Sequence, residues 1–322
     1  MTFAPPREAL AALPTPLHEL PRLGAALGGP RILIKRDDLA GFALGGNKVR
    51  KLEYFLADAR ARGADTLITC GGVQSNHCRV TAAAAARAGM SCLLVLSGSR
   101  PERLTGNALL DQLFGAELVF VASRAERAAR MEALAGELGA KGRLPYVIPL
   151  GGSTPLGAYG YVEAAREFAA ECRALGVSVS TIVHASSSGG TQAGLVVGCL
   201  AAGLSTRVIG ISADETREDL SRMVVDLAVP LAERLGLPAL GKEAIEVADE
   251  YVGEGYASPT PASREATRLF ARHEGIVLDG TYSAKAAAGL IDLVRRGRWS
   301  RKDTVCFWHT GAQASLSEAL PA

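Results

Sequence analysis

Three basic side chains stand close together near the N-terminus, and one of them is placed for chemistry. Lys48, Arg50 and Lys51 occur in the segment GGNKVRKLE, residues 45–53. Lys48 follows Gly-Gly-Asn at the expected junction of a loop and a helix, where glycines allow a flat ligand to approach. A lysine that is desolvated beside other cations has a lowered pKa and becomes a nucleophile. Lys48 is therefore a candidate catalyst, although most lysines on helix surfaces are simply solvated charges.

Two glycine-rich turns are candidates for binding an anion. They are ITCGGVQSNHCRV, residues 68–80, and VHASSSGGTQAGL, residues 183–195. Each leads into an expected helix, whose N-terminus offers unpaired N–H groups and the positive end of a dipole. The second turn is neither a P-loop nor a dinucleotide fingerprint. Taken singly, each turn is better explained as a tight connection without a ligand. In the second turn the residues that would contact an anion are Ser188, Gly189, Gly190 and Thr191.

A reactive lysine combined with a phosphate-binding turn suggests pyridoxal phosphate, because enzymes hold that cofactor through a lysine and a phosphate site. On these residues alone, an unrelated small-molecule enzyme is an equal alternative. The five histidines lack metal-ligand spacing, so we expect no metal.

The elements that would carry these residues alternate between strand and helix along the chain. Runs typical of buried strands lie at 31–37, 66–72, 91–98 and 117–122. Helical patterns lie between them, for example at 48–63, 75–89 and 158–175. Ser75 or Asn76 is expected to cap the helix that ends at Gly89. This alternation predicts an α/β fold with a mostly parallel sheet and helices on both faces.

Composition excludes several classes of partner. The chain is 48% hydrophobic and 21% charged with a net charge of +2, so we expect neither a nucleic acid nor an anionic membrane as partner. The longest apolar run, 193–204, is far shorter than the ~20 residues of a membrane span. Residues 1–10 lack the apolar core of a signal peptide, and the six cysteines form no CxxC pair. We therefore expect a cytoplasmic protein with reduced thiols.

Five motifs in order resemble the D-cysteine desulfhydrase and 1-aminocyclopropane-1-carboxylate (ACC) deaminase family. They are KRDD…GGNKVRKLE, GGVQSNHCR, GNALLDQLFGAELV, SGGTQAGL and LDGTYSAKAAAGL, and the likeness runs from about residue 16 to 316. The resemblance implies a pyridoxal phosphate enzyme with the fold of the tryptophan synthase β-subunit (fold type II). That fold has two open, twisted, mostly parallel sheets with helices on both faces. It would divide the chain into a smaller domain, 51–160, and a discontinuous larger domain, 1–50 plus 161–322, with the active site in the cleft and a homodimer as the assembly.

The resemblance also implies roles for individual residues toward the cofactor. Lys48 would bind the cofactor covalently through its amine and act as the catalytic base, and Lys51 would lie near the cofactor phosphate. Asn76 would donate a hydrogen bond to the ring hydroxyl. Arg50 would be structural. The phosphate loop would comprise Ser188, Gly189, Gly190 and Thr191.

Further residues would contact a small amino-acid substrate. Ser75 matches a catalytic serine that faces the substrate, and Tyr256 and Tyr282 match two catalytic tyrosines over the active site. The loop expected to hold the substrate carboxylate comprises Gln74, Ser75, Asn76 and His77.

Two positions indicate the branch of the family. Ser283 and Thr310 stand where ACC deaminases have Glu and Leu, and either hydroxyl would face the pyridine nitrogen of the cofactor. A carboxylate would keep the pyridine nitrogen protonated and make the cofactor ring a strong electron sink, whereas a neutral hydroxyl leaves the ring a weaker one. The weaker sink suffices to expel a thiol from Cβ but not to open a cyclopropane. Ser283 would equally serve as a cap for the helix that follows it.

The resemblance therefore implies β-elimination of D-cysteine to pyruvate, hydrogen sulfide and ammonia. The turn before Tyr282 departs from the family, with Gly280 and Thr281 in place of Pro-Val, and so does Gly311-Ala312 in place of Gly-Gly. These departures bear on the substrate more than on the cofactor. An L-cysteate sulfo-lyase or another β-eliminase remains an alternative, ACC deamination is a less favoured one, and a sensor that binds pyridoxal phosphate or an amino acid is the alternative without catalysis.

Overall fold

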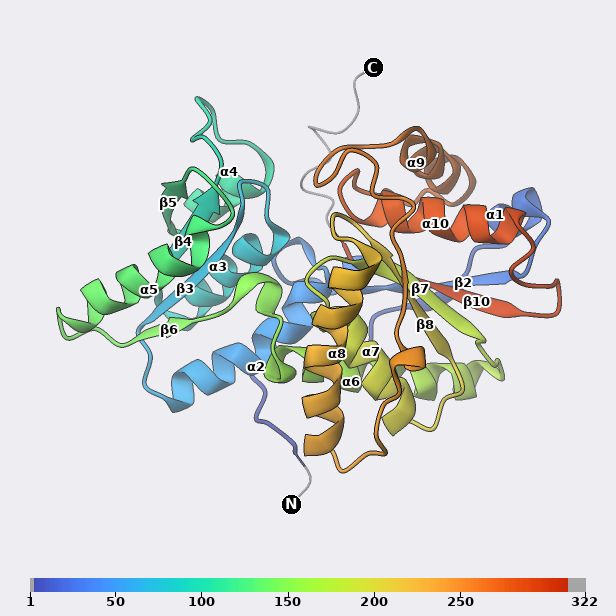
Figure 1. Cartoon of the computed structure of the whole chain (residues 1–322), viewed down its shortest axis with the longest axis horizontal. Coiled ribbons are helices and arrows are strands. Elements are labelled where there is room, and N and C mark those ends of the chain that lie inside the picture. Colours follow the sequence, from blue (N-terminus) through green and yellow to red (C-terminus); the bar gives the residue numbers. More distant parts are fainter. Residues whose placement is uncertain (1–2, 312–322) are drawn as a thin grey trace.

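The computed structural model describes residues 3–311, so Ala312 and the end of the predicted resemblance at residue 316 lie outside it. Two sheets form the frame of the molecule and lie side by side (Figure 1). The larger sheet has six strands in the order β1-β2-β10-β7-β8-β9, and the smaller has four in the order β5-β4-β3-β6. Every neighbouring pair is parallel except β1 with β2. The predicted α/β class with two mostly parallel sheets is confirmed.

The bounds of the strands show which parts of the chain build each sheet. The larger sheet uses β1 (Leu17–Glu19), β2 (Arg31–Arg36), β7 (Thr181–Ser186), β8 (Arg207–Ser212), β9 (Glu246–Ala248) and β10 (Thr304–His309). The smaller sheet uses β3 (Thr66–Gly72), β4 (Ser91–Ser97), β5 (Glu117–Val121) and β6 (Pro145–Val147). The smaller sheet thus lies within the predicted domain 51–160, whose boundaries we retain as a proposal.

Ten helices cover the sheets within the described residues. They are α1 (Pro21–Leu27), α2 (Asn47–Ala61), α3 (Asn76–Ala88), α4 (Gly106–Leu113), α5 (Glu126–Gly139), α6 (Pro155–Leu175), α7 (Gly190–Ala201), α8 (Arg217–Arg234), α9 (Pro261–Glu274) and α10 (Ser283–Arg295). Helices α1, α9 and α10 lie on one face of the larger sheet, and α6, α7 and α8 lie on the other (Figure 1). None of these helices is long and apolar enough to cross a membrane.

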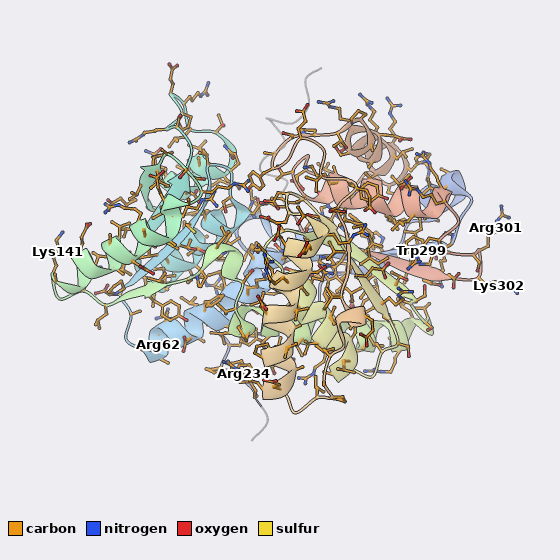
Figure 2. All side chains as sticks on the ribbon, in the orientation of Figure 1. Arg62, Lys141, Arg234, Trp299, Arg301 and Lys302 are labelled. Atoms are coloured by element: carbon orange, nitrogen blue, oxygen red, sulfur yellow. The ribbon has the colours of Figure 1, made fainter. Side chains whose placement is uncertain are left out.

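Burial on both faces explains the composition of the central strands. All six residues of β7 are buried, because helices cover both of its sides and water reaches neither. Charged side chains are carried at the periphery instead, where Lys141 and Arg301 project from opposite ends of the molecule (Figure 2). Some cations are buried nevertheless, among them Arg50 and Lys51 of α2.

Candidate functional site

A cavity of about 590 Å³ lies where both sheets present the carboxyl ends of their strands. It receives residues from the turns after β3, β7 and β8 and from the start of α2. Ligand sites of open α/β sheets commonly occupy this position, and the volume is typical of a small-molecule site. The predicted residues that line it are Lys48, Ser75, Asn76, His77, Ser188, Gly189, Thr191, Tyr256, Tyr282 and Thr310. Gln74, Lys51, Gly190 and Ser283, also predicted, lie outside its lining.

Lys48 and Lys51 lie one turn apart on α2, and both amines reach the same carbonyl. Each Nζ donates a hydrogen bond to Gly151 O over 3.2 Å. Lys48 is partly open to the cavity, whereas Lys51 is completely buried. Loss of hydration lowers the pKa of Lys48 to about 8. The pKa of Lys51 is lowered well below its usual value by burial and, secondly, by the charge of Lys48.

Neither amine has an acidic partner among residues 3–311, although buried charges are normally paired.

Arg50, on the same helix, differs from the two lysines because it has acidic partners. Its guanidinium binds Asp37 over 2.9 Å and Glu167 over 2.8 Å. Burial opposes the ionisation of Asp37, but the guanidinium of Arg50 outweighs it and holds the pKa of that carboxyl below its usual value. Arg50 is therefore a structural cation, in agreement with the prediction.

The turn between β7 and α7 provides a second set of donors beside the lysines. Gly189 has a left-handed backbone with φ of 73°, and no side chain caps the N-terminus of α7. A Cβ at Gly190 would lie 2.8 Å from the Nζ of Lys51 and 2.8 Å from the Oγ of Ser153. A side chain at this position would therefore displace the amine of Lys51 or the hydroxyl of Ser153. Ser153 in turn donates a hydrogen bond to the Oγ of Ser188 over 2.8 Å.

These features fit pyridoxal phosphate. The buried amine of Lys51, which has no carboxylate partner among residues 3–311, and the uncapped N-terminus of α7 would compensate the charge of a phosphate dianion. The amine of Lys48 lies beside them and is partly open to the cavity. A Cβ at Gly151 would lie 2.3 Å from the Oγ of Ser188 and 3.3 Å from the Nζ of Lys48, so the backbone passes close to the reactive amine. No group of three or more described His, Cys, Asp or Glu residues has the arrangement of a metal site.

The start of α3 holds Ser75 and Asn76 at the cavity wall. Ser75 caps the helix, with its Oγ accepting from Cys78 N over 3.3 Å, as one of the two predicted caps. The Oδ1 of Asn76 accepts from Asn107 Nδ2 over 2.9 Å and from Arg79 Nη1 over 3.2 Å. These bonds fix the orientation of the amide, so that its Nδ2 is the group left to donate toward the cavity.

Asn107 on α4 was not predicted, and it also explains the position of Gln74. Its backbone N–H donates to the Oε1 of Gln74, and its Nδ2 donates to the carbonyl of Gln74, both over 2.8 Å. Gln74 is held in this way against α4 and lines a smaller neighbouring cavity rather than the main one. His77, in the same loop, is buried, and its Nε2 donates to the Oγ1 of Thr69 over 2.8 Å. Burial and the nearby charges of Lys48 and Lys51 lower the pKa of His77, so its ring is neutral.

Tyr256 and Tyr282 meet at the cavity from different parts of the chain. Their hydroxyl oxygens lie 2.7 Å apart, and their rings pack edge to face with centroids 5.8 Å apart. Burial raises the pKa of both phenols, so both are neutral near pH 7.

Thr310 and Ser283 have different surroundings, which the sequence left open. Thr310 lines the cavity, and its carbonyl accepts from Asn47 N at the start of α2 over 2.9 Å. The hydroxyl of Ser283 instead donates to the carboxylate of Asp279 over 2.6 Å and accepts from the backbone N–H of the same residue. The predicted role of Ser283 at the cofactor is therefore not supported, because its hydroxyl is directed to Asp279 and the residue does not line the cavity. The predicted cap is wrong as well, because Ser283 is the first residue of α10 and Tyr282 occupies the cap position.

One wall of the cavity was missed entirely by the sequence analysis. Four residues around the start of α5 line it at positions i, i+3, i+4 and i+7: Arg124, Arg127, Ala128 and Met131. This spacing marks one face of a helix, but it is shared by any amphipathic helix, so the sequence offered no reason to select it. Asp214, after β8, also lines the cavity and was not predicted.

Comparison with known proteins agrees with this geometry. Residues 9–311 match the family described as pyridoxal-phosphate dependent enzyme. A D-cysteine desulfhydrase of Klebsiella pneumoniae subsp. pneumoniae is 43% identical over 97% of this chain and 95% of its own length. A crystal structure of an ACC deaminase homologue superposes with a TM-score of 0.90 at 38% identity, covering 98% of this chain and 97% of the other.

A threonine deaminase of T.th. superposes with a TM-score of 0.67 at 23% identity, covering 93% of this chain and 92% of the other, and it shares the fold. The matched family spans nearly all of the described residues and includes both lysines and the β7–α7 turn. The chain belongs to the pyridoxal-phosphate dependent enzymes.

Proposed function

We propose that the protein is a carbon–sulfur lyase that converts D-cysteine and water to pyruvate, hydrogen sulfide and ammonia. The observation that carries the choice of substrate is the 43% identity, over nearly the full length of both chains, to a protein named D-cysteine desulfhydrase. The position of Thr310 supports the same branch, because a threonine lines the cavity where ACC deaminases are expected to have leucine.

Lys48 is proposed as the catalytic base at Cα. Bound pyridoxal phosphate supplies the electron sink that stabilises negative charge at this carbon. With a pKa of about 8, the Lys48 amine is neutral often enough near physiological pH to accept a proton, and the same residue is the proposed covalent attachment point. Lys48 lies at the start of α2, and this end of the helix is held next to the end of β10 because Asn47 N donates a hydrogen bond to Thr310 O.

The remaining residues are proposed to bind and orient. Lys51 would hold the cofactor phosphate together with the β7–α7 turn, and the Nδ2 of Asn76 would donate to the ring hydroxyl. Thr310, rather than Ser283, would face the pyridine nitrogen. The substrate carboxylate would bind at the start of α3, beside Ser75, Asn76 and His77, which line the cavity. The paired tyrosines would cover the site. The residues assigned to the phosphate are Lys51, Ser188, Gly189, Gly190 and Thr191.

We also propose that the protein is cytoplasmic, and that it forms a homodimer, as the family resemblance implies. All six cysteines are free and buried, which agrees with a reducing compartment. Light scattering of the purified holoenzyme would measure the assembly: a mass of two chains would support the dimer and a mass of one chain would contradict it.

The substrate is tested by pyruvate release from purified protein with pyridoxal phosphate. D-cysteine, L-cysteine, L-cysteate, D-serine and ACC would be compared at equal concentrations. We expect preferential turnover of D-cysteine. Pyruvate release from another compound and none from D-cysteine would contradict the proposed substrate. The assignments of the cofactor and of Lys48 would still hold. ACC is included because a structural neighbour is an ACC deaminase homologue.

A further inference from the structure

The wall formed by α5 carries two arginines with different surroundings. Arg124 is half exposed at the mouth of the cavity, where its Nη1 lies 3.4 Å from the Oδ2 of Asp214. Its guanidinium also stacks on the ring of Tyr256, 4.9 Å from the centroid. The charge of Arg124 is therefore already compensated by protein groups.

Arg127 lies one turn further along and is only 9% exposed. Its Nη2 donates to the Oγ of Ser97, and its Nε is buried without a hydrogen-bond partner. No carboxylate among residues 3–311 forms an ion pair with it. Because a buried cation is costly unless it is paired, an unpaired guanidinium that lines a cavity indicates an anion that is absent from the protein itself.

The position of Arg127 separates this anion from the ones already assigned. A smaller cavity of about 290 Å³ adjoins the main one, and both are lined by Gly72, Arg124, Arg127 and Tyr256. Arg127 thus lies at the boundary of the two cavities. The cofactor phosphate is assigned to Lys51 and α7, and the substrate carboxylate to the start of α3. Arg127 is therefore available to a further negative group.

We propose that Arg127 binds a second anionic group of the amino-acid substrate, so that the cavity selects α-amino acids whose β-substituent is negatively charged. A carboxylate, a sulfonate and an ionised thiol belong to this class. The proposal rests on the proposed function in that it takes the ligand of the cavity to be an amino acid. The planar fork of a guanidinium matches carboxylate and sulfonate groups in particular, because two parallel N–H donors meet two oxygens.

The test compares the binding of aspartate and asparagine, each as the D and the L enantiomer, to the holoenzyme. The two ligands have the same size and differ in the charge at the side chain, and neither carries a thiol or sulfonate to expel. Dissociation constants would be obtained from the change in cofactor absorbance on titration. We expect at least one enantiomer of aspartate to bind about tenfold more tightly than the matching asparagine, the size of a charge-assisted hydrogen bond.

Three variants assign this preference to Arg127. Arg127→Gln should abolish the preference, and Arg127→Lys should retain part of it. Arg130→Gln should leave it unchanged, because Arg130 lies on the same helix with its guanidinium bound to Glu137 at the surface. A wild-type enzyme without any preference for aspartate would overturn the proposal, and so would an Arg127→Gln variant that keeps the full preference.

The result is independent of the substrate test. Turnover of D-cysteine with no preference for aspartate would refute the second anion site alone. An Arg127-dependent preference for aspartate without turnover of D-cysteine would support the site and refute the proposed substrate.

Discussion

Helix α2 carries cations of two kinds within its first turns. Arg50 is surrounded by carboxylates, with Asp37 and Glu167 bound to its guanidinium. Lys48 and Lys51 reach no carboxylate among the described residues and share a single carbonyl. Since a folded protein normally pairs its buried charges, the first cluster is complete without a ligand and the second is not. We propose that this difference separates a cation that stabilises the fold from amines that bind an anionic cofactor.

The same contrast recurs on the opposite wall of the site. Arg124 is paired with Asp214, and Arg127, three residues later, has no acidic partner within residues 3–311. On α2 and at the start of α5, a basic residue type does not by itself show whether the side chain stabilises the fold or binds a ligand. The presence or absence of a carboxylate partner distinguishes the two cases.

Removing Lys48 should give the largest effect. Lys48→Ala should lower turnover by at least about a thousandfold, because both the proposed covalent attachment and the proposed base are lost. It should also remove the absorbance of lysine-bound cofactor. Pyruvate release and the visible spectrum measure the two effects. Lys141→Ala, at an exposed position in the turn that follows α5, is the control and should change neither. Retained turnover in Lys48→Ala would contradict the assignment.

Breaking the paired cluster should cost stability. Arg50→Met leaves Asp37 buried without its cation, and we expect the apoprotein to lose about 3–5 kcal/mol of unfolding free energy. The control is Arg60→Met on the same helix, which breaks an exposed pair with Glu8 and should cost about 0–1 kcal/mol. Urea denaturation of both apoproteins measures the difference. Equal losses would mean that the Arg50 cluster is no more structural than a surface pair.

Removing the amine of Lys51 should not destabilise the apoprotein, in contrast to the removal of Arg50. Lys51→Met deletes a buried charge that no described carboxylate compensates, so the unfolding free energy of the apoprotein should stay the same or rise. Affinity for pyridoxal phosphate should fall about tenfold or more, the size of a charged hydrogen bond. Affinity for pyridoxal, which lacks the phosphate, should change little. An equal fall for both compounds would place Lys51 away from the phosphate.

A change of pH should reveal the desolvation of Lys48 in the stability of the apoprotein. The pKa of Lys48 is lowered to about 8 in the folded protein from an ordinary value of about 10.5, so the unfolded chain holds the extra proton between these pH values. The stability of the apoprotein should therefore rise as the pH increases from about 8 to about 10.5. Lys48→Met removes this contribution and should flatten the rise. A parallel pH dependence in both proteins would show that Lys48 is not desolvated.

Much of the frame could be predicted because it depends on local pattern. The two glycine-rich turns, the cap at Ser75 and the alternation of strands and helices all follow from residue type and spacing. The helix predicted at 158–175 begins three residues earlier, at Pro155. Thr154 caps it and Pro155 occupies its first turn, two local start signals that the prediction did not use.

The rest of the site depends on contacts between distant segments. Asp279 draws the hydroxyl of Ser283 away from the cavity, and nothing in the segment itself distinguishes that outcome from a hydroxyl facing the cofactor. Asn107 orients Asn76 and Gln74 from another helix. Arg127 became a candidate only when the structure showed no acidic partner for it within residues 3–311. Pairing of charges is a tertiary property, so one sequence cannot assign it.

The most direct test of the unpaired lysines is to locate the cofactor on the chain. Borohydride reduction of the holoenzyme makes the bond between lysine and cofactor permanent, and peptide mass spectrometry then identifies the modified residue. We predict that the added mass lies on Lys48. Attachment at Lys51, or at another buried lysine such as Lys285, would contradict the division of α2 into a structural and a cofactor-binding set of cations.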